Sequence, residues 1–164
     1  MVKRTIPLLL AAAFPFTIWT LGGLVGGTEP PPVSPVLLLL LFWAAGLAGA
    51  VTVLWQSLRG QWAGRRLALA AVIVKLVHIQ NYVTLFFGAV LLFMIPFVTV
   101  LIWAVDVMTI FLSGLIGLAA VLRCRVENRL TTRAAVVNGI LQFVFCADVF
   151  SAIWVYRNTK EAFL

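Results

Sequence analysis

Long apolar runs separated by short arginine-rich segments are the feature that most restricts how this chain can fold. The run from Val36 to Leu58, for example, contains no charged residue. A membrane-spanning helix needs about 20 consecutive, predominantly apolar residues, and these runs lack the strict alternation of a half-buried strand. The chain is therefore predicted to be all-α, a polytopic transmembrane helical bundle.

Composition points the same way. The chain is 63% hydrophobic and only 10% charged, with a mean hydropathy of +1.12, whereas a soluble domain is about 45–50% apolar and about 25% charged. A net charge of +7 in a soluble protein would suggest nucleic-acid binding. Here the basic residues lie in clusters between apolar runs, where they act as topology signals. We expect contact with the lipid bilayer and no nucleic-acid partner.

The apolar runs predict five spans in a single domain covering residues 1–164. The first run is longer than the apolar region of a signal peptide, so we expect it to be retained as a span. A proline-rich stretch follows it, and Pro96 divides the long central run into a hairpin. An alternative places Leu67 to Asn81 as an interfacial helix, which reduces the number of spans to four. The predicted spans are about 5–27, 36–58, 67–94, 97–122 and 134–156.

Arginine distribution predicts the orientation. Lys3 and Arg4, the loop 59–66 and the loop 123–133 hold most of the basic residues, which favours placing all three segments in the cytoplasm. The N-terminus is then cytoplasmic, and a fifth span carries the C-terminus to the other side. Arg157 and Lys160 do not fit this arrangement, and a four-span fold would return them to the cytoplasm.

Four ionisable residues fall inside the predicted spans: Lys75, His78, Asp106 and Asp148. A lysine or aspartate at the centre of a spanning helix costs about 2.5–3.5 kcal/mol on insertion scales, so such residues face a bundle interior or a watery cavity. Three- and four-residue spacing predicts that one helical face carries the following residues, with Asn81 at its border: Ala68, Ala71, Lys75, His78 and Tyr82.

Helical rise allows the depths of these polar residues to be compared. At about 1.5 Å per residue, Lys75, His78 and Asn81 lie about 12, 17 and 21 Å from the cytoplasmic ends of their spans, and Gln142, Asp148 and Asp106 about 12, 21 and 24 Å. The overlap predicts a buried cluster in which Asp148, and with weaker support Asp106, faces Lys75. The predicted binding residues are Lys75, His78, Asn81, Tyr82, Asp106, Gln142 and Asp148.

Such a cluster has two interpretations. An acid, a lysine and a histidine near mid-membrane can bind an ion or a small polar solute and exchange protons. In the structural interpretation, Lys75 extends to the lipid headgroups, or an aspartate pairs with it to fix the helix register. Solute handling requires water to reach Lys75, His78 and Asp148, whereas an accessory or immunity-type subunit of a larger membrane complex predicts that they are sealed.

Small-residue patterns favour close helix packing, with a homo-oligomer or a larger membrane partner as the alternative. They occur at Gly22 and Gly26, Gly23 and Gly27, Gly46 and Gly49, and Ser113 and Gly117. We predict no metal site, cofactor or catalytic residue, because the chain has a single histidine, two separated cysteines and no catalytic motif. An intramembrane hydrolase that uses both aspartates is a third hypothesis, and it requires them on facing helices at one depth.

Two segments, Lys75 to Tyr82 and Gly139 to Ala152, resemble parts of an uncharacterised bacterial family of small polytopic membrane proteins. The resemblance implies a bacterial inner-membrane location and draws attention to the lysine, histidine, asparagine and aspartate within these segments. It implies no particular activity, substrate or cofactor.

Overall fold

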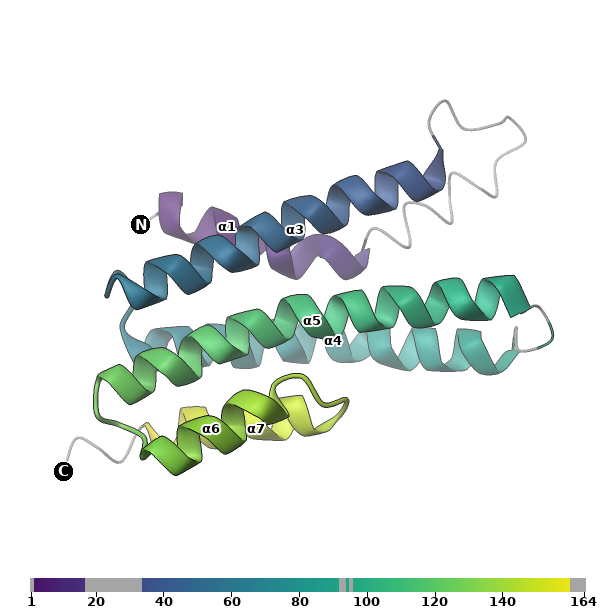
Figure 1. Ribbon diagram of the computed structural model, residues 1–164. Helices are drawn as coiled ribbons and strands as arrows, with labels where there is room; N and C mark the ends of the chain where they lie inside the picture. Colours follow the sequence, from purple (N-terminus) through teal and green to yellow (C-terminus); the bar gives the residue numbers. More distant parts are fainter. Residues whose placement is uncertain (1, 17–33, 92–93, 95, 160–164) are drawn as a thin grey trace.

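The computed structural model describes residues 2–16, 34–91, 94 and 96–159 (Figure 1). Within these ranges the chain forms six α-helices and one short 3₁₀ helix, and no strand, which confirms the all-α prediction. The elements are α1 (Val2–Ala13), η1 (Phe14–Phe16), α3 (Pro35–Leu58), α4 (Gly64–Leu91), α5 (Pro96–Val126), α6 (Thr132–Leu141) and α7 (Ala147–Asn158).

Three of the helices, α3, α4 and α5, are long and apolar enough to cross a membrane. They contain 24, 28 and 31 residues, which correspond to about 36, 42 and 46 Å of helix against about 30 Å of bilayer hydrocarbon. They indicate a multi-pass membrane protein in contact with lipid. Because α4 continues without a break past Asn81, the alternative of an interfacial helix at 67–81 is wrong.

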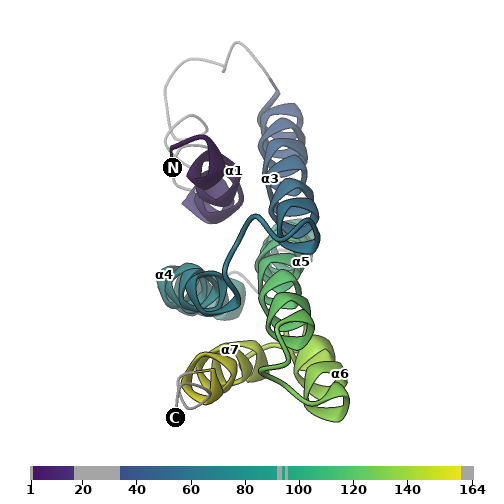
Figure 2. The same cartoon turned by 90° about the vertical axis from the view of Figure 1, so that its left-hand side faces the viewer.

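The prediction of five spans is also wrong, and the clearest departure is at residues 134–156. Two short helices, α6 with 10 residues and α7 with 12, run antiparallel as a hairpin beside α4 and α5 (Figure 1). At about 15 and 18 Å long, each can reach only about halfway through a bilayer. Figure 2 looks at the end of the bundle and shows α7 beside α4 and α6 beside α5.

The turn between α6 and α7 explains why the sequence suggested one continuous helix. Residues 142–146 are largely apolar and contain neither proline nor glycine, so hydropathy gives no sign of a break. Cys146 adopts φ 63° and ψ −40°, and the Ala147 amide donates to the Phe145 carbonyl at 2.8 Å. This geometry is close to a γ-turn of the rare, strained kind, which a chain adopts only where its surroundings hold it.

The described part of the first predicted span is shorter than a full crossing. Its apolar helical stretch is Thr5–Phe16, and the rest of that span lies outside the described residues, as do the glycine pairs at 22, 23, 26 and 27. The α1 helix packs antiparallel to α3, and a Cβ at Gly49 would overlap the Pro7 carbonyl. Gly46, where a Cβ would lie 3.0 Å from Leu112 Cδ1, likewise serves packing within the bundle.

Glu127 connects the α3–α4 loop and the α5–α6 loop, which lie at the same end of the bundle. Its carboxylate accepts from the Gly64 amide at 2.9 Å and pairs with Arg123 and Arg129 at 3.0 Å each. Arg123 Nε also donates to the Trp62 carbonyl at 2.9 Å. These contacts join the α3–α4 loop to the α5–α6 loop.

Every arginine of the described chain lies at this end, called the arginine end below (Figure 1). Arg157 is among them because α7 returns the chain toward its starting side, and Arg129 Nη1 donates to the Thr159 carbonyl at 3.2 Å. The prediction that the last span ends opposite the arginine loops is therefore wrong. The conflict over Arg157 disappears because the last segment turns back instead of crossing.

Candidate functional site

The polar stripe predicted on α4 faces the interior of the bundle. Ala68, Ala71, Lys75, His78, Asn81 and Tyr82 are all buried. Leu76, Ile79 and Val83, which point the other way, are exposed, as expected for a helix with one face toward lipid and one toward its neighbours. The three- and four-residue spacing therefore identifies which residues of α4 lie inside.

Lys75 and Asp148 form an ion pair inside the bundle. Lys75 Nζ lies 2.7 Å from Asp148 Oδ2, and the two side chains are 0% and 1% exposed. Lys75 Nζ also donates to the Gln142 carbonyl at 3.4 Å. Lys75 thus does not extend to the headgroups, and the pair connects α4 to the first turn of α7, where the helix dipole also favours a carboxylate.

A chain of hydrogen bonds joins the two arms of the hairpin near this pair. Gln142 Nε2 donates to Ser151 Oγ at 2.9 Å, and that hydroxyl donates to Asn138 Oδ1 at 2.8 Å. All three side chains are buried. Sequence reasoning missed Asn138 and Ser151 because neither is charged. Their signal was spacing, since Asn138 and Gln142 are four residues apart, and Asp148 and Ser151 three.

The tip of the hairpin rests on a glycine pair of α5. A Cβ at Gly114 would lie 2.6 Å from Phe143 Cδ1 and 3.0 Å from the Gln142 carbonyl oxygen. A Cβ at Gly117 would overlap the Gln142 side chain. These two glycines therefore create the space in which the turn sits, and the small residues of α5 serve hairpin packing.

His78 and Asn81 do not contact Asp148 by any hydrogen bond in the described structure. His78 Nε2 donates to the Ala12 carbonyl of α1 at 3.0 Å, while its Nδ1 and Asn81 Nδ2 are buried and have no partner among the described residues. His78 meets the Tyr82 ring edge-on at a centroid distance of 6.4 Å. The predicted cluster is therefore divided, with His78 turned toward α1.

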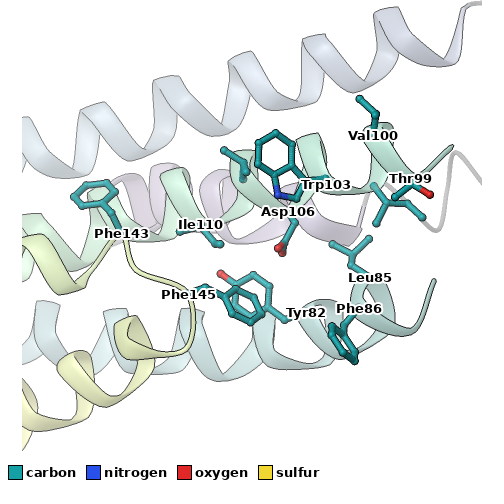
Figure 3. A pocket seen from close by; sticks show the side chains of 12 residues that line it. Tyr82, Leu85, Phe86, Thr99, Val100, Trp103, Asp106, Ile110, Phe143 and Phe145 are labelled. Atoms are coloured by element: carbon teal, nitrogen blue, oxygen red, sulfur yellow. The ribbon is translucent and has the colours of Figure 1, made fainter. Parts of the chain in front are cut away.

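Asp106 is not part of the ion pair and lies just beyond the tip of the α6–α7 hairpin. It is half-buried, and its Oδ1 is buried without a hydrogen-bond partner in the described part of the chain. Asp106 lines a cavity of about 620 Å³ together with residues of α4, of α5 and of the hairpin tip. Figure 3 shows its carboxylate pointing into this space near Tyr82 and Phe145.

Aromatic residues make up five of the twelve described residues that line the cavity. Tyr82, Phe86, Trp103, Phe143 and Phe145 all contribute to it, and the Tyr82 and Phe145 rings meet at a centroid distance of 5.5 Å. The Tyr82 hydroxyl lies 3.5 Å from Ser113 Oγ. Tyr82 thus stands at the boundary between the sealed half of the bundle and the cavity.

The three residues at which solute handling requires water, Lys75, His78 and Asp148, are each 0% exposed at the surface of the bundle. The open space lies beside Asp106 instead. The two aspartates do not share a site, since the cavity is lined by Asp106 and not by Asp148. The arrangement therefore gives no support to hydrolysis by paired aspartates.

Metal binding has no geometric basis in the described residues, which contain no group of three or more histidine, cysteine, aspartate or glutamate side chains. Cys124 is buried and Cys146 exposed, and both are free thiols. Among the described residues, the site offers one ion pair enclosed by the hairpin and, in a cavity with aromatic lining, the Asp106 carboxylate with no ion-pair partner. No protein-family model, curated protein or solved structure matches this chain.

Proposed function

We propose that this multi-pass membrane protein handles an ion or small polar solute, and that the solute binds beside Asp106 rather than at the Lys75–Asp148 pair. The observation that carries the proposal is the Asp106 carboxylate in a cavity of about 620 Å³, with its Oδ1 buried and without a hydrogen-bond partner in the described part of the chain. A carboxylate in apolar surroundings is costly unless a partner offsets its charge. A bound solute that is positively charged or donates hydrogen bonds would supply that partner.

The ion pair has a supporting role in this proposal. Lys75 and Asp148 satisfy each other's charge at 2.7 Å with no exposed side-chain surface, which leaves no room for a solute between them. Their attraction holds α7 to α4 and thereby fixes the hairpin tip that forms one wall of the cavity. The cluster predicted from the sequence then has two parts. Lys75 and Asp148 hold the cavity wall in place, and Asp106 binds the solute.

The test uses a hydrophobic carbodiimide, which reacts with carboxyl groups that it can reach within a membrane. In the purified chain in lipid nanodiscs, mass spectrometry should find modification at Asp106 and none at Asp148. Small cations or polar solutes that bind in the cavity should slow this modification. The proposal is wrong if Asp106 stays unmodified, or if no solute class protects it.

An accessory or immunity-type subunit is the second candidate, favoured by the sealing of Lys75, His78 and Asp148. Exposed apolar side chains on α3, such as Leu41, Phe42 and Trp55, offer a surface for a second copy or a larger membrane partner. Crosslinking in native membranes before purification tests this candidate. A single stoichiometric partner, combined with no solute protection at Asp106, would favour it over solute handling.

We further propose that the arginine end faces the cytoplasm of a bacterial cell, in the inner membrane. Support comes from the gathering of arginines at one end of the described bundle together with the excess of arginine and lysine in cytoplasmic loops. Both the start of α1 and the end of α7 then lie on the cytoplasmic side. A reporter fused after Leu164 should give a cytoplasmic signal, and a periplasmic signal would contradict this orientation.

A further inference from the structure

The cavity beside Asp106 combines one negative charge with several aromatic faces. Tyr82, Phe86, Trp103, Phe143 and Phe145 line it around the Asp106 carboxylate. Aromatic faces carry a negative quadrupole and attract a cation within about 6 Å of the ring centroid, and this interaction strengthens when the cation is desolvated. A carboxylate and aromatic rings in one cavity therefore favour a positively charged ligand.

The same wall is poorly suited to a bare metal ion. Calcium takes about six to eight oxygen ligands, and magnesium usually keeps several water molecules in an octahedral shell. Among the described lining residues, the cavity offers the Asp106 carboxylate, the hydroxyl-bearing side chains of Tyr82 and Thr99, and the Trp103 indole on an otherwise apolar wall. Its volume of about 620 Å³ falls within the roughly 300–1,000 Å³ typical of small-molecule sites. The geometry favours an organic ligand.

The rim of the cavity faces the bilayer. Trp103 and Phe86 are 69% and 60% exposed on the bundle surface, and Asp106 lies ten residues after the start of α5 at Pro96, which is about 15 Å along the helix. Counted from Arg123 in the last turn of α5, Asp106 lies about 25 Å along the helix, which is within a hydrocarbon layer about 30 Å thick but toward its far side. A ligand that enters over this rim must itself be soluble in the bilayer.

We propose that the cavity binds a hydrophobic, monovalent organic cation, with Asp106 as its counter-charge and Trp103 as an aromatic contact. This inference rests on the proposed function and names its ligand class. The ligand must be soluble in the bilayer and must carry a positive charge. A delocalised positive charge meets both conditions, since it enters hydrocarbon more readily than a compact ion and still pairs with a carboxylate. The ion pair of the other half takes no part in binding.

Tetraphenylphosphonium is a suitable probe, and equilibrium dialysis against the full chain in nanodiscs measures its binding. Wild-type protein should bind it saturably. Asp106→Asn should weaken binding at least about tenfold because it removes the counter-charge, and Trp103→Leu should weaken it about threefold through loss of a cation–π contact. Asp106→Glu keeps the charge and should retain binding, which separates loss of charge from loss of folding.

Thr84→Val is the matched control, because Thr84 is an exposed residue of α4 whose hydroxyl bonds its own helix at the Gln80 carbonyl. It should bind the probe like the wild type. Equal binding to the wild type and Asp106→Asn would overturn the inference. Equal binding of neutral triphenylphosphine oxide would also overturn it, by showing a groove for apolar molecules such as lipid chains.

The outcomes also separate this inference from the function on which it rests. If potassium or a neutral polar solute protects Asp106 from the carbodiimide while tetraphenylphosphonium does not, the ligand class is wrong and solute handling at Asp106 stands. If the carbodiimide does not modify Asp106 at all, both solute handling at Asp106 and the proposed ligand class are wrong.

Discussion

Asp148 and Asp106 are both aspartates within apolar parts of the chain, yet they have different surroundings in the fold. Asp148 lies in the half of the bundle that the α6–α7 hairpin covers, where Lys75 neutralises it at 2.7 Å. Asp106 lies in the half beyond the hairpin tip, where it lines a cavity and forms no ion pair with any described residue. The length of the α6–α7 hairpin therefore determines which aspartate forms a structural ion pair and which one lines a cavity that a ligand can enter.

The two halves also differ in how tightly they are connected. In the arginine half, the ion pair, the Gln142–Ser151–Asn138 hydrogen bonds and the Glu127 contacts tie loops and helices together. In the other half, the polar contact recorded at the cavity wall is the one between the Tyr82 hydroxyl and Ser113 Oγ at 3.5 Å.

The largest effect expected from any single change is the loss of one partner of the ion pair. Lys75→Met and Asp148→Asn should each lower the free energy of unfolding by about 3–5 kcal/mol, because breaking a buried pair leaves a charge or a polar group without compensation. Denaturant titration in nanodiscs measures this loss.

The exchanged pair, Lys75→Asp with Asp148→Lys, is the control for these variants and should recover much of the stability. If it also keeps solute protection at Asp106, the pair is structural only. If Lys75→Met or Asp148→Asn is as stable as the wild type, the ion pair does not stabilise the fold, and Asp148 does not differ from Asp106 in the way described above.

A smaller loss of unfolding free energy is expected when a side chain fills the space at Gly114 in which the hairpin tip packs. Gly114→Ala should cost about 1–3 kcal/mol through overpacking, since the new Cβ meets the Phe143 ring and the Gln142 carbonyl. Gly88→Ala in the other half is the matched control. Of the described atoms, its Cβ meets Ile102 Cδ1 alone, at 3.6 Å, so it should be neutral or stabilise the helix by up to about 1 kcal/mol. Equal losses in both variants would contradict the tight packing at Gly114.

The Glu127 contacts at the arginine end should contribute less than the ion pair. Glu127→Gln should lower the unfolding free energy by about 1 kcal/mol, because the carboxylate is partly exposed and solvent weakens such pairs. Added salt should reduce the difference between variant and wild type, whereas the Asp148→Asn loss should respond little to salt because its pair is shielded from solvent. A salt response of the same size in both variants would show that the Lys75–Asp148 pair is open to solvent.

The smallest effect on stability is expected at Asp106. Asp106→Asn should change the unfolding free energy by no more than about 0.5 kcal/mol, because no ion pair or hydrogen bond of the described chain depends on it. The same variant should abolish solute-dependent changes in tryptophan fluorescence, which Trp103 reports from the cavity wall. If Asp106→Asn destabilises the protein as much as Asp148→Asn, Asp106 is a structural residue and the contrast fails.

The sequence by itself determined the parts of this protein that depend on local pattern. Apolar run length identified α3, α4 and α5, because crossing a bilayer sets a minimum number of apolar residues. Helical spacing placed Lys75, His78 and Tyr82 on the buried face of α4, and the arginine clusters marked one end of the bundle. None of these inferences requires knowledge of what packs against what.

Only the tertiary structure decided the turn at Cys146, and with it the return of α7, the pairing of Asp148 and the exposure of Asp106 to a cavity. Hydropathy averages over a window and records neither chain direction nor a break within an apolar stretch, so residues 134–156 resembled one span. The turn depends on contacts between Gln142 or Phe143 and the distant glycines 114 and 117. Long-range packing of this kind stabilises a backbone conformation that the local sequence does not indicate.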